Sequence, residues 1–90
     1  MSHLKTQPEL VARVRRIGGQ LASVERALTE GSECAAVLQQ VAAIRGAVNG
    51  LMEEILEAHL REHVAAPQLD DAERAEGAAQ VMAAIRRYAK

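Results

Sequence analysis

The stretch CAAVLQQVAAIRGAVNGLMEEILEAHLREHV, residues 34–64, decides the fold of this chain. It contains no proline, and its apolar residues recur three or four positions apart, which predicts one continuous helix. Ser32 is a suitable N-cap and Pro67 ends the pattern, so we expect the helix to span residues 33–66. One apolar stripe contains Val37, Val41, Ile44, Val48, Leu51 and Ile55, and a second contains Leu38, Met52, Leu56, His59 and His63.

The two stripes occupy more than half of the helix circumference, so this helix has to be covered on several sides. At ~1.5 Å per residue, residues 33–66 span roughly 50 Å. A globule of 90 residues has a radius of gyration of only ~12 Å. The helix therefore extends beyond the core that its own chain can build. We expect an antiparallel homodimer of such helices, built further into a tetramer.

A first helix is predicted over residues 7–29. Thr6 and Glu9 have the spacing of a capping box, and Pro8 lies in the first turn, which tolerates proline. Gly31 is a stop signal. The apolar residues alternate at spacings of four and three, which is an a/d heptad pattern. They are Leu10, Val14, Ile17, Leu21, Val24 and Leu28.

A third helix is predicted over residues 71–89, with Asp70–Glu73 as its start and Gly77 as its weakest point. Because no repeat, low-complexity segment or internal boundary is present, residues 1–90 are expected to form a single domain. The expected fold class is all-α, with three helices and a long central one. The apolar face of the third helix contains Ala78, Val81, Met82, Ile85 and Tyr88.

The composition is typical of a small helical protein from a reducing compartment. Apolar residues make up 49% of the chain, yet Tyr88 is its single Phe, Trp or Tyr residue, and a core of Ala, Val, Leu, Ile and Met suits helices. Cys34 is the single cysteine and cannot form an internal disulfide. No apolar run approaches the ~20 residues of a membrane span, and the N-terminus lacks the features of a signal peptide. We therefore expect a cytoplasmic protein with no membrane partner.

The net charge of −1 hides a segregated distribution. Residues 1–28 contain five basic and two acidic side chains, whereas residues 53–76 contain eight acidic and two basic ones. The C-terminal end, with Arg86, Arg87 and Lys90, is basic again. A basic face for nucleic acid can coexist with such a total. From composition alone, solvated helix faces explain the same pattern.

A metal site is predicted at the end of the long helix, because His59 and His63 are four residues apart and share one face. Two ligands rarely suffice, and the remaining soft donor is Cys34, in the first turn of the helix, where the thiolate is favoured. Cys34 and His59 are 25 residues apart, about 37 Å of helix, so they cannot meet within one chain. In an antiparallel dimer, Cys34 of one chain can meet both histidines of its partner, twice per dimer.

Two N-terminal donors extend the predicted ligand set. Removal of Met1 before the small Ser2 leaves a free amine next to His3. One sulfur with several nitrogens suits Co(II) or Ni(II), and four-coordinate Zn(II) is an alternative. Taken singly, solvated histidines and a small apolar cysteine are the plainer interpretation. Their combination with the dimer geometry favours metal binding.

The segment His59–His63 also matches H-x-x-E-H, the signature of a class of zinc peptidases. Such enzymes need a third ligand well downstream and a substrate cleft, but only 27 residues follow His63. We therefore expect no enzymatic activity, and the zinc hydrolase stays a remote alternative. Glu62 is expected to face solvent or a neighbouring arginine.

Two segments carry a family resemblance. VRRIGGQLASVERAL, residues 14–28, and the stretch 34–64 resemble the CsoR/RcnR/FrmR family of bacterial repressors, and the match extends over essentially the whole chain. The resemblance implies a three-helix protomer, an antiparallel dimer with a four-helix core, and a tetramer made of two dimers. It also implies binding of double-stranded operator DNA without ligand, release on binding an inducer, and ligands that cross the dimer interface.

The MSH start, Cys34, His59 and His63 are similar to the nickel/cobalt branch, RcnR and its relatives, which implies induction by Ni(II) or Co(II) and control of a metal-efflux gene. Copper(I) sensors have Cys-His-Cys, so His63 counts against copper, and sulfur sensors carry a second cysteine. Formaldehyde sensors begin with Met-Pro and lack the second histidine. RVRRI (13–17) and VERAL (24–28) nevertheless resemble that branch. The alternative function is therefore aldehyde sensing, with the Cys34 thiolate and the N-terminal amine bridged by a methylene.

The resemblance also assigns the DNA contacts. The family has no helix-turn-helix and uses basic residues of the first two helices. The low aromatic content argues against base stacking on single strands, so phosphate neutralisation should dominate affinity. An interchain ion pair is the alternative role for Arg45. The implied DNA-contacting residues are Arg13, Arg15, Arg16, Gln20, Arg45 and Lys90.

Overall fold

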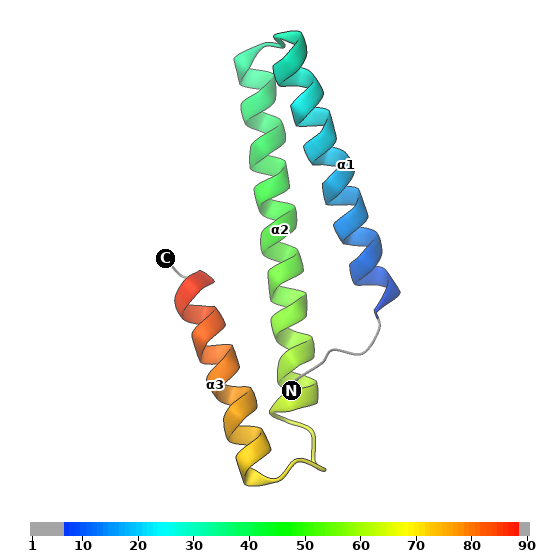
Figure 1. Ribbon diagram of the computed structural model, residues 1–90. Coiled ribbons are helices and arrows are strands. Elements are labelled where there is room, and N and C mark those ends of the chain that lie inside the picture. The colour runs from blue at the N-terminus through cyan, green and yellow to red at the C-terminus, as the bar shows by residue number, and fades with distance from the viewer. Residues whose placement is uncertain (1–6, 89–90) are drawn as a thin grey trace. The chain divides into compact units, whose positions relative to one another are not determined.

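The computed structural model describes residues 7–88, in which three helices and no strands are found (Figure 1). The helices are α1 (Pro8–Glu30), α2 (Cys34–His63) and α3 (Asp71–Tyr88). The prediction of an all-α chain with a long central helix is confirmed for these residues. Two compact units are present within them, Gln7–Met52 and residues 53–88.

The start of α1 differs from the predicted capping box. Gln7, not Thr6, is the N-cap; its backbone is extended (φ −128°, ψ 93°) and its side chain makes no capping hydrogen bond. The reason is Pro8, whose fixed φ suits the first helical position and whose ring excludes the helical conformation from the residue before it. The carbonyl of Gln7 accepts the first helical hydrogen bonds, from Leu10 at 3.0 Å and Val11 at 3.2 Å. Thr6 lies outside the described residues.

Gly31 ends α1, as its sequence position predicts. It adopts the left-handed conformation (φ 73°), which residues with a Cβ rarely adopt, and its N–H bonds to the carbonyl of Ala27. The Ser32 N–H reaches the same carbonyl at 2.9 Å. The chain therefore turns within a few residues, and α2 begins at Cys34, two residues after the predicted N-cap.

The unit Gln7–Met52 is a hairpin of α1 and the first part of α2 (Figure 1). It buries Leu10, Ile17 and Ile44, and Gln40 donates a hydrogen bond to the Ser23 hydroxyl at 3.2 Å. The hairpin covers only one edge of the apolar stripe of α1, because Val14, Leu21 and Leu28 stay exposed, with Leu28 at 66%. The large apolar residues exposed on this unit are Val11, Val14, Leu21 and Leu28 from α1 and Leu38, Val41 and Val48 from α2.

Residues 53–88 contain the rest of α2 and α3, which pack through small side chains. Ala58 is 2% exposed and Val81 8%, and Gly77 is buried between the two helices. At the start of α3, the Glu73 carboxylate accepts the Asp70 N–H at 2.9 Å and the Asp70 carboxylate accepts the Glu73 N–H at 2.8 Å. This reciprocal pair is a capping box, so the predicted start of α3 is confirmed.

The end of α2 lies at His63, three residues before the predicted end at Ala66. The chain leaves the helix through a turn in which the Ala65 N–H bonds to the Leu60 carbonyl at 2.8 Å. Arg74 of α3 then donates hydrogen bonds to three carbonyls of the connection, those of Val64, Ala66 (3.3 Å) and Leu69 (3.1 Å). These bonds satisfy carbonyls of the connection that have no partner within a helix. Within residues 7–88, no helix combines the length and apolar content needed to cross a bilayer.

Candidate functional site

The two histidines predicted as ligands lie together on the last turns of α2. Both are half-buried, and their ring centroids are 4.9 Å apart with the planes tilted by 51°. Two imidazoles that bind one ion at ~2.1 Å place their centroids roughly 4.5–5.2 Å apart for cis positions. The spacing between His59 and His63 therefore fits a shared metal ion, as the i,i+4 pattern predicts.

Neighbouring groups already engage both rings. His59 Nε2 is 3.1 Å from the carbonyl oxygen of Gly77 in α3. His63 Nε2 is 4.0 Å from Glu62 Oε2. Glu62 does not face solvent or an arginine as expected, because its side chain is only 20% exposed and its Oε2 is buried without a hydrogen bond in the described part of the chain. The arginine nearby, Arg61, instead bonds to Glu57 at 2.8 Å.

Cys34 is the first residue of α2 and carries a free, exposed thiol. It belongs to the unit Gln7–Met52, whereas the histidine pair belongs to the unit of residues 53–88. Among residues 7–88, no three His, Cys, Asp or Glu side chains of one chain are grouped to hold a metal ion. The other predicted ligands, Ser2 and His3, lie outside the described residues.

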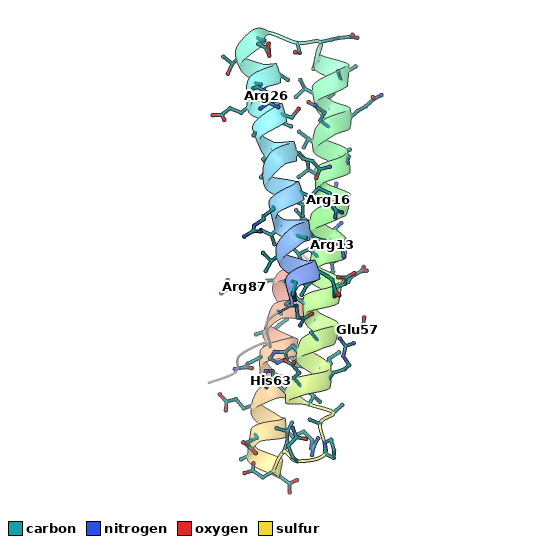
Figure 2. All side chains as sticks on the ribbon, turned by 90° about the vertical axis from the view of Figure 1, so that its right-hand side faces the viewer. Arg13, Arg16, Arg26, Glu57, His63 and Arg87 are labelled. Carbon is teal, nitrogen blue, oxygen red and sulfur yellow. The ribbon has the colours of Figure 1, made fainter. Side chains whose placement is uncertain are left out.

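The arginines assigned to DNA differ in exposure. Arg15 and Arg16 on α1 and Arg45 on α2 are exposed. Arg13 is half-buried, and its guanidinium lies over α2 where a Cβ on Gly50 would be 2.9 Å from Nη2 (Figure 2). Gln20 is also half-buried, with an Oε1 that is buried and has no hydrogen-bond partner among the described residues. Lys90 lies outside the described residues.

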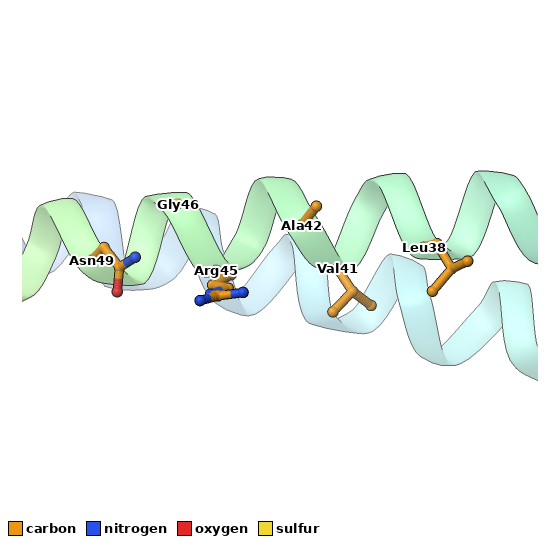
Figure 3. A pocket seen from close by; sticks show the side chains of 6 residues that line it. All are labelled: Leu38, Val41, Ala42, Arg45, Gly46 and Asn49. Atoms are coloured by element: carbon orange, nitrogen blue, oxygen red, sulfur yellow. The ribbon is translucent and has the colours of Figure 1, made fainter. Parts of the chain in front are cut away.

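A shallow groove runs along the N-terminal half of α2 and includes Arg45 (Figure 3). No side chain lies within 4 Å of the Cβ position at Gly46, so the floor of the groove is open. The lining residues come from successive turns of the one helix. They are Leu38, Val41, Ala42, Arg45, Gly46 and Asn49.

A family model for metal-sensitive transcriptional repressors matches residues 6–87, nearly the whole chain. The chain belongs to this repressor family. The family consists of transcriptional repressors and not of enzymes, so the repressor assignment is confirmed and the zinc-hydrolase alternative is excluded. Metal-sensitive repressors bind operator DNA and respond to metal.

Similar proteins extend over the full length of this repressor. An uncharacterised protein in the bioA 5′ region of Serratia marcescens is 54% identical over 91 residues, covering 100% of both chains. The transcriptional repressor RcnR of Salmonella paratyphi B is 46% identical, again over 100% of both chains. A solved structure of a variant of the formaldehyde-responsive regulator FrmR, from Salmonella enterica serovar Typhimurium, has a TM-score of 0.85 at 43% identity. It covers 93% of this chain and 99% of that one.

Two residues that contact or support the histidine pair are not predicted by the sequence pattern. Gly77 reads in the sequence as a weak point of α3, yet its carbonyl meets His59. The sequence suggests a surface charge for Arg74, yet its guanidinium donates hydrogen bonds to backbone carbonyls of the connection that follows His63. A glycine inside a helical pattern is the signal available for Gly77, because it costs helix stability and so points to a close packing contact. Nothing in the sequence marks Arg74.

Proposed function

We propose that this repressor is a cytoplasmic homotetramer that binds double-stranded operator DNA without metal and leaves it when Ni(II) or Co(II) binds, thereby controlling a metal-efflux gene. Residues 1–90 act as a single repressor domain in this proposal. The observation that carries the metal function is the histidine pair, two nitrogen donors at a spacing that suits one ion. The RcnR relatives support the same function.

The proposed ligand set joins two chains of an antiparallel dimer. Cys34 of one chain meets His59 and His63 of the partner chain, and the amine of Ser2 with His3 completes the coordination. Cys34 is the first residue of α2 and His63 the last. A helix of 30 residues is about 45 Å long, so donors at its two ends need a second, antiparallel helix to meet.

Helical spacing supports α2 as the dimer contact. Starting at Cys34, steps of four, seven, seven, four, three and four residues connect one stripe of α2. Steps of this kind return to the same helix face. When two such stripes pair antiparallel with Cys34 opposite the histidines, the twofold axis falls near residues 46–49, at the C-terminal end of the open groove. The stripe contains Cys34, Leu38, Arg45, Met52, Leu56, His59 and His63.

The proposed DNA surface consists mainly of exposed arginines. Arg15, Arg16 and Arg45 can reach phosphates without rearrangement, because they are exposed. Arg13 and Gln20 are half-buried and are proposed as secondary contacts, together with Lys90. Such a surface neutralises phosphates and gives affinity that falls steeply with salt.

The assembly is the first testable consequence. The metal-free protein should have a mass near four chains in light scattering, because the exposed apolar residues of α1 and α2 need partners. Replacement of Leu38 by Glu, in the groove of α2, should shift the mass toward the monomer. The matched control is Gln39→Glu, also exposed but outside the stripe. A stable monomer of the parent protein at micromolar concentration would remove the basis for a site shared between chains.

Formaldehyde sensing is the second candidate function, and the FrmR structure supports it. The exposed Cys34 thiol is a suitable nucleophile. Condensation of the thiol and the N-terminal amine with formaldehyde forms a methylene bridge and releases water. Mass spectrometry after treatment with formaldehyde would then find one added carbon linking Ser2 to Cys34. Absence of this cross-link, at formaldehyde concentrations that leave lysines unmodified, would count against aldehyde sensing.

A further inference from the structure

Gly77 allows α3 to lie directly against the last turn of α2. A Cβ at this position would be 1.9 Å from the carbonyl oxygen of His63 and 2.8 Å from its carbonyl carbon. Backbone atoms cannot move aside as the end of a flexible side chain can. Any residue with a side chain at position 77 would therefore push the two helices apart.

The same close approach brings the Gly77 carbonyl to His59. The oxygen is 3.1 Å from His59 Nε2. A carbonyl oxygen only accepts hydrogen bonds, so Nε2 has to carry the proton. In the neutral imidazole, the lone pair is then on Nδ1, and a histidine binds metal through the nitrogen that has the lone pair.

Arg74 keeps this contact in place. It lies one turn before Gly77 on the same side of α3, and its guanidinium bonds to carbonyls of Val64, Ala66 and Leu69 in the connection between the helices. Arg74 therefore fixes the connection to α3 one turn before Gly77, whose carbonyl contacts His59.

We propose that Gly77 is a positioning residue for the metal site: its missing side chain and its carbonyl select the Nε2–H tautomer of His59 and present Nδ1 to the ion. The inference rests on the proposed metal function. Partners that orient a histidine ligand in this way fix its tautomer and increase its basicity, and their loss lowers metal affinity about 10–100-fold in other proteins. Gly77 acts through His59 and does not touch the ion.

The test starts with the metal-free tetramer, so that tautomer selection is measured apart from metal binding. Long-range ¹H–¹⁵N NMR of the imidazole rings, at a pH where they are neutral, distinguishes the two tautomers. The parent protein should have His59 in the Nε2–H form, and Gly77→Ala should give a mixture. Gly18→Ala is the matched control, because no side chain and no other helix lies within 4 Å of a Cβ placed there. It should leave the His59 signals unchanged.

Thermal unfolding and Ni(II) titration complete the test. Gly18→Ala should raise the melting temperature through helix propensity, whereas Gly77→Ala should lower it despite the same gain. Gly77→Ala should also weaken Ni(II) binding about 10–100-fold. His59→Gln places an amide donor near the position of Nε2 and should retain most of the melting temperature while losing Ni(II) affinity. His59→Ala should lose both.

Two results would overturn the inference: an Nδ1–H tautomer of His59 in the parent protein, or Gly77→Ala with unchanged tautomer and unchanged Ni(II) affinity. Failure of the proposed metal function would give a different set of results. In that case the parent protein has the expected tautomer, and Gly77→Ala changes it, yet neither Ni(II) nor Co(II) binds to the parent.

Discussion

Cys34→Ala should abolish the sulfur-to-metal charge-transfer absorption of the Co(II) complex, and a second mutant chain should partly restore it. The restoring chain is the double variant His59→Ala/His63→Ala, which lacks the nitrogen donors but keeps the thiol. If the ligands come from different chains, a mixed dimer contains one intact site and one empty one. Each dimer has two sites, because each contact of a twofold interface occurs twice. Random pairing of equal amounts makes about half of the dimers mixed, so about a quarter of all sites are restored.

The measurement is the Co(II) absorption spectrum after the two chains are unfolded and refolded together. The control mixes Cys34→Ala with the triple variant that lacks Cys34, His59 and His63, which offers no intact combination. Refolded mixtures that bind no more Co(II) than this control would show that the site lies within one chain.

Arg16→Ala should weaken operator binding and flatten its dependence on salt. Arg16 is exposed on α1, and each phosphate contact contributes about 0.9 to the slope of log affinity against log salt. A tetramer that uses two copies of Arg16 on the DNA would lose a slope of about 2. The measurement is fluorescence anisotropy of a labelled duplex from upstream of the gene, at several salt concentrations.

Arg61→Ala is the matched control for charge. Arg61 is also exposed, but it is paired with Glu57 at 2.8 Å and lies near the C-terminal end of α2. Its loss removes the same formal charge and should change the slope little. Equal effects of the two substitutions would mean that net charge, and not a contact by Arg16, determines the affinity. Co(II) binding should be retained in both variants.

Much of the fold is local and could therefore be predicted from the sequence. The heptad spacing of α1, the stop at Gly31 and the capping box of Asp70 and Glu73 depend on residues within a turn or two of each other. Two helix ends differ from the prediction, the start of α1 and the end of α2. Pro8 moves the N-cap of α1 to Gln7, and the carbonyl contacts of Arg74 accompany the end of α2 at His63.

The site could be predicted only in part, for a related reason. The i,i+4 spacing brings His59 and His63 together because one helix carries both. One group beside the pair, the Gly77 carbonyl, comes from α3, and the helix packing that brings it to His59 cannot be read from spacing along the chain. The Glu62 side chain is half-buried and its Oε2 is buried, which the spacing along the helix did not predict.

The central claim is that metal binding releases this repressor from DNA. The most direct measurement is anisotropy of the labelled duplex bound to the parent protein, titrated with Ni(II), with Co(II) and separately with formaldehyde. We expect either metal to weaken DNA binding by at least about 5-fold, the lower end of the 5–150-fold range of typical allosteric coupling. The Cys34→Ala variant should stay bound to DNA when the same metal is added. Release by formaldehyde while both metals leave the complex intact would contradict the central claim.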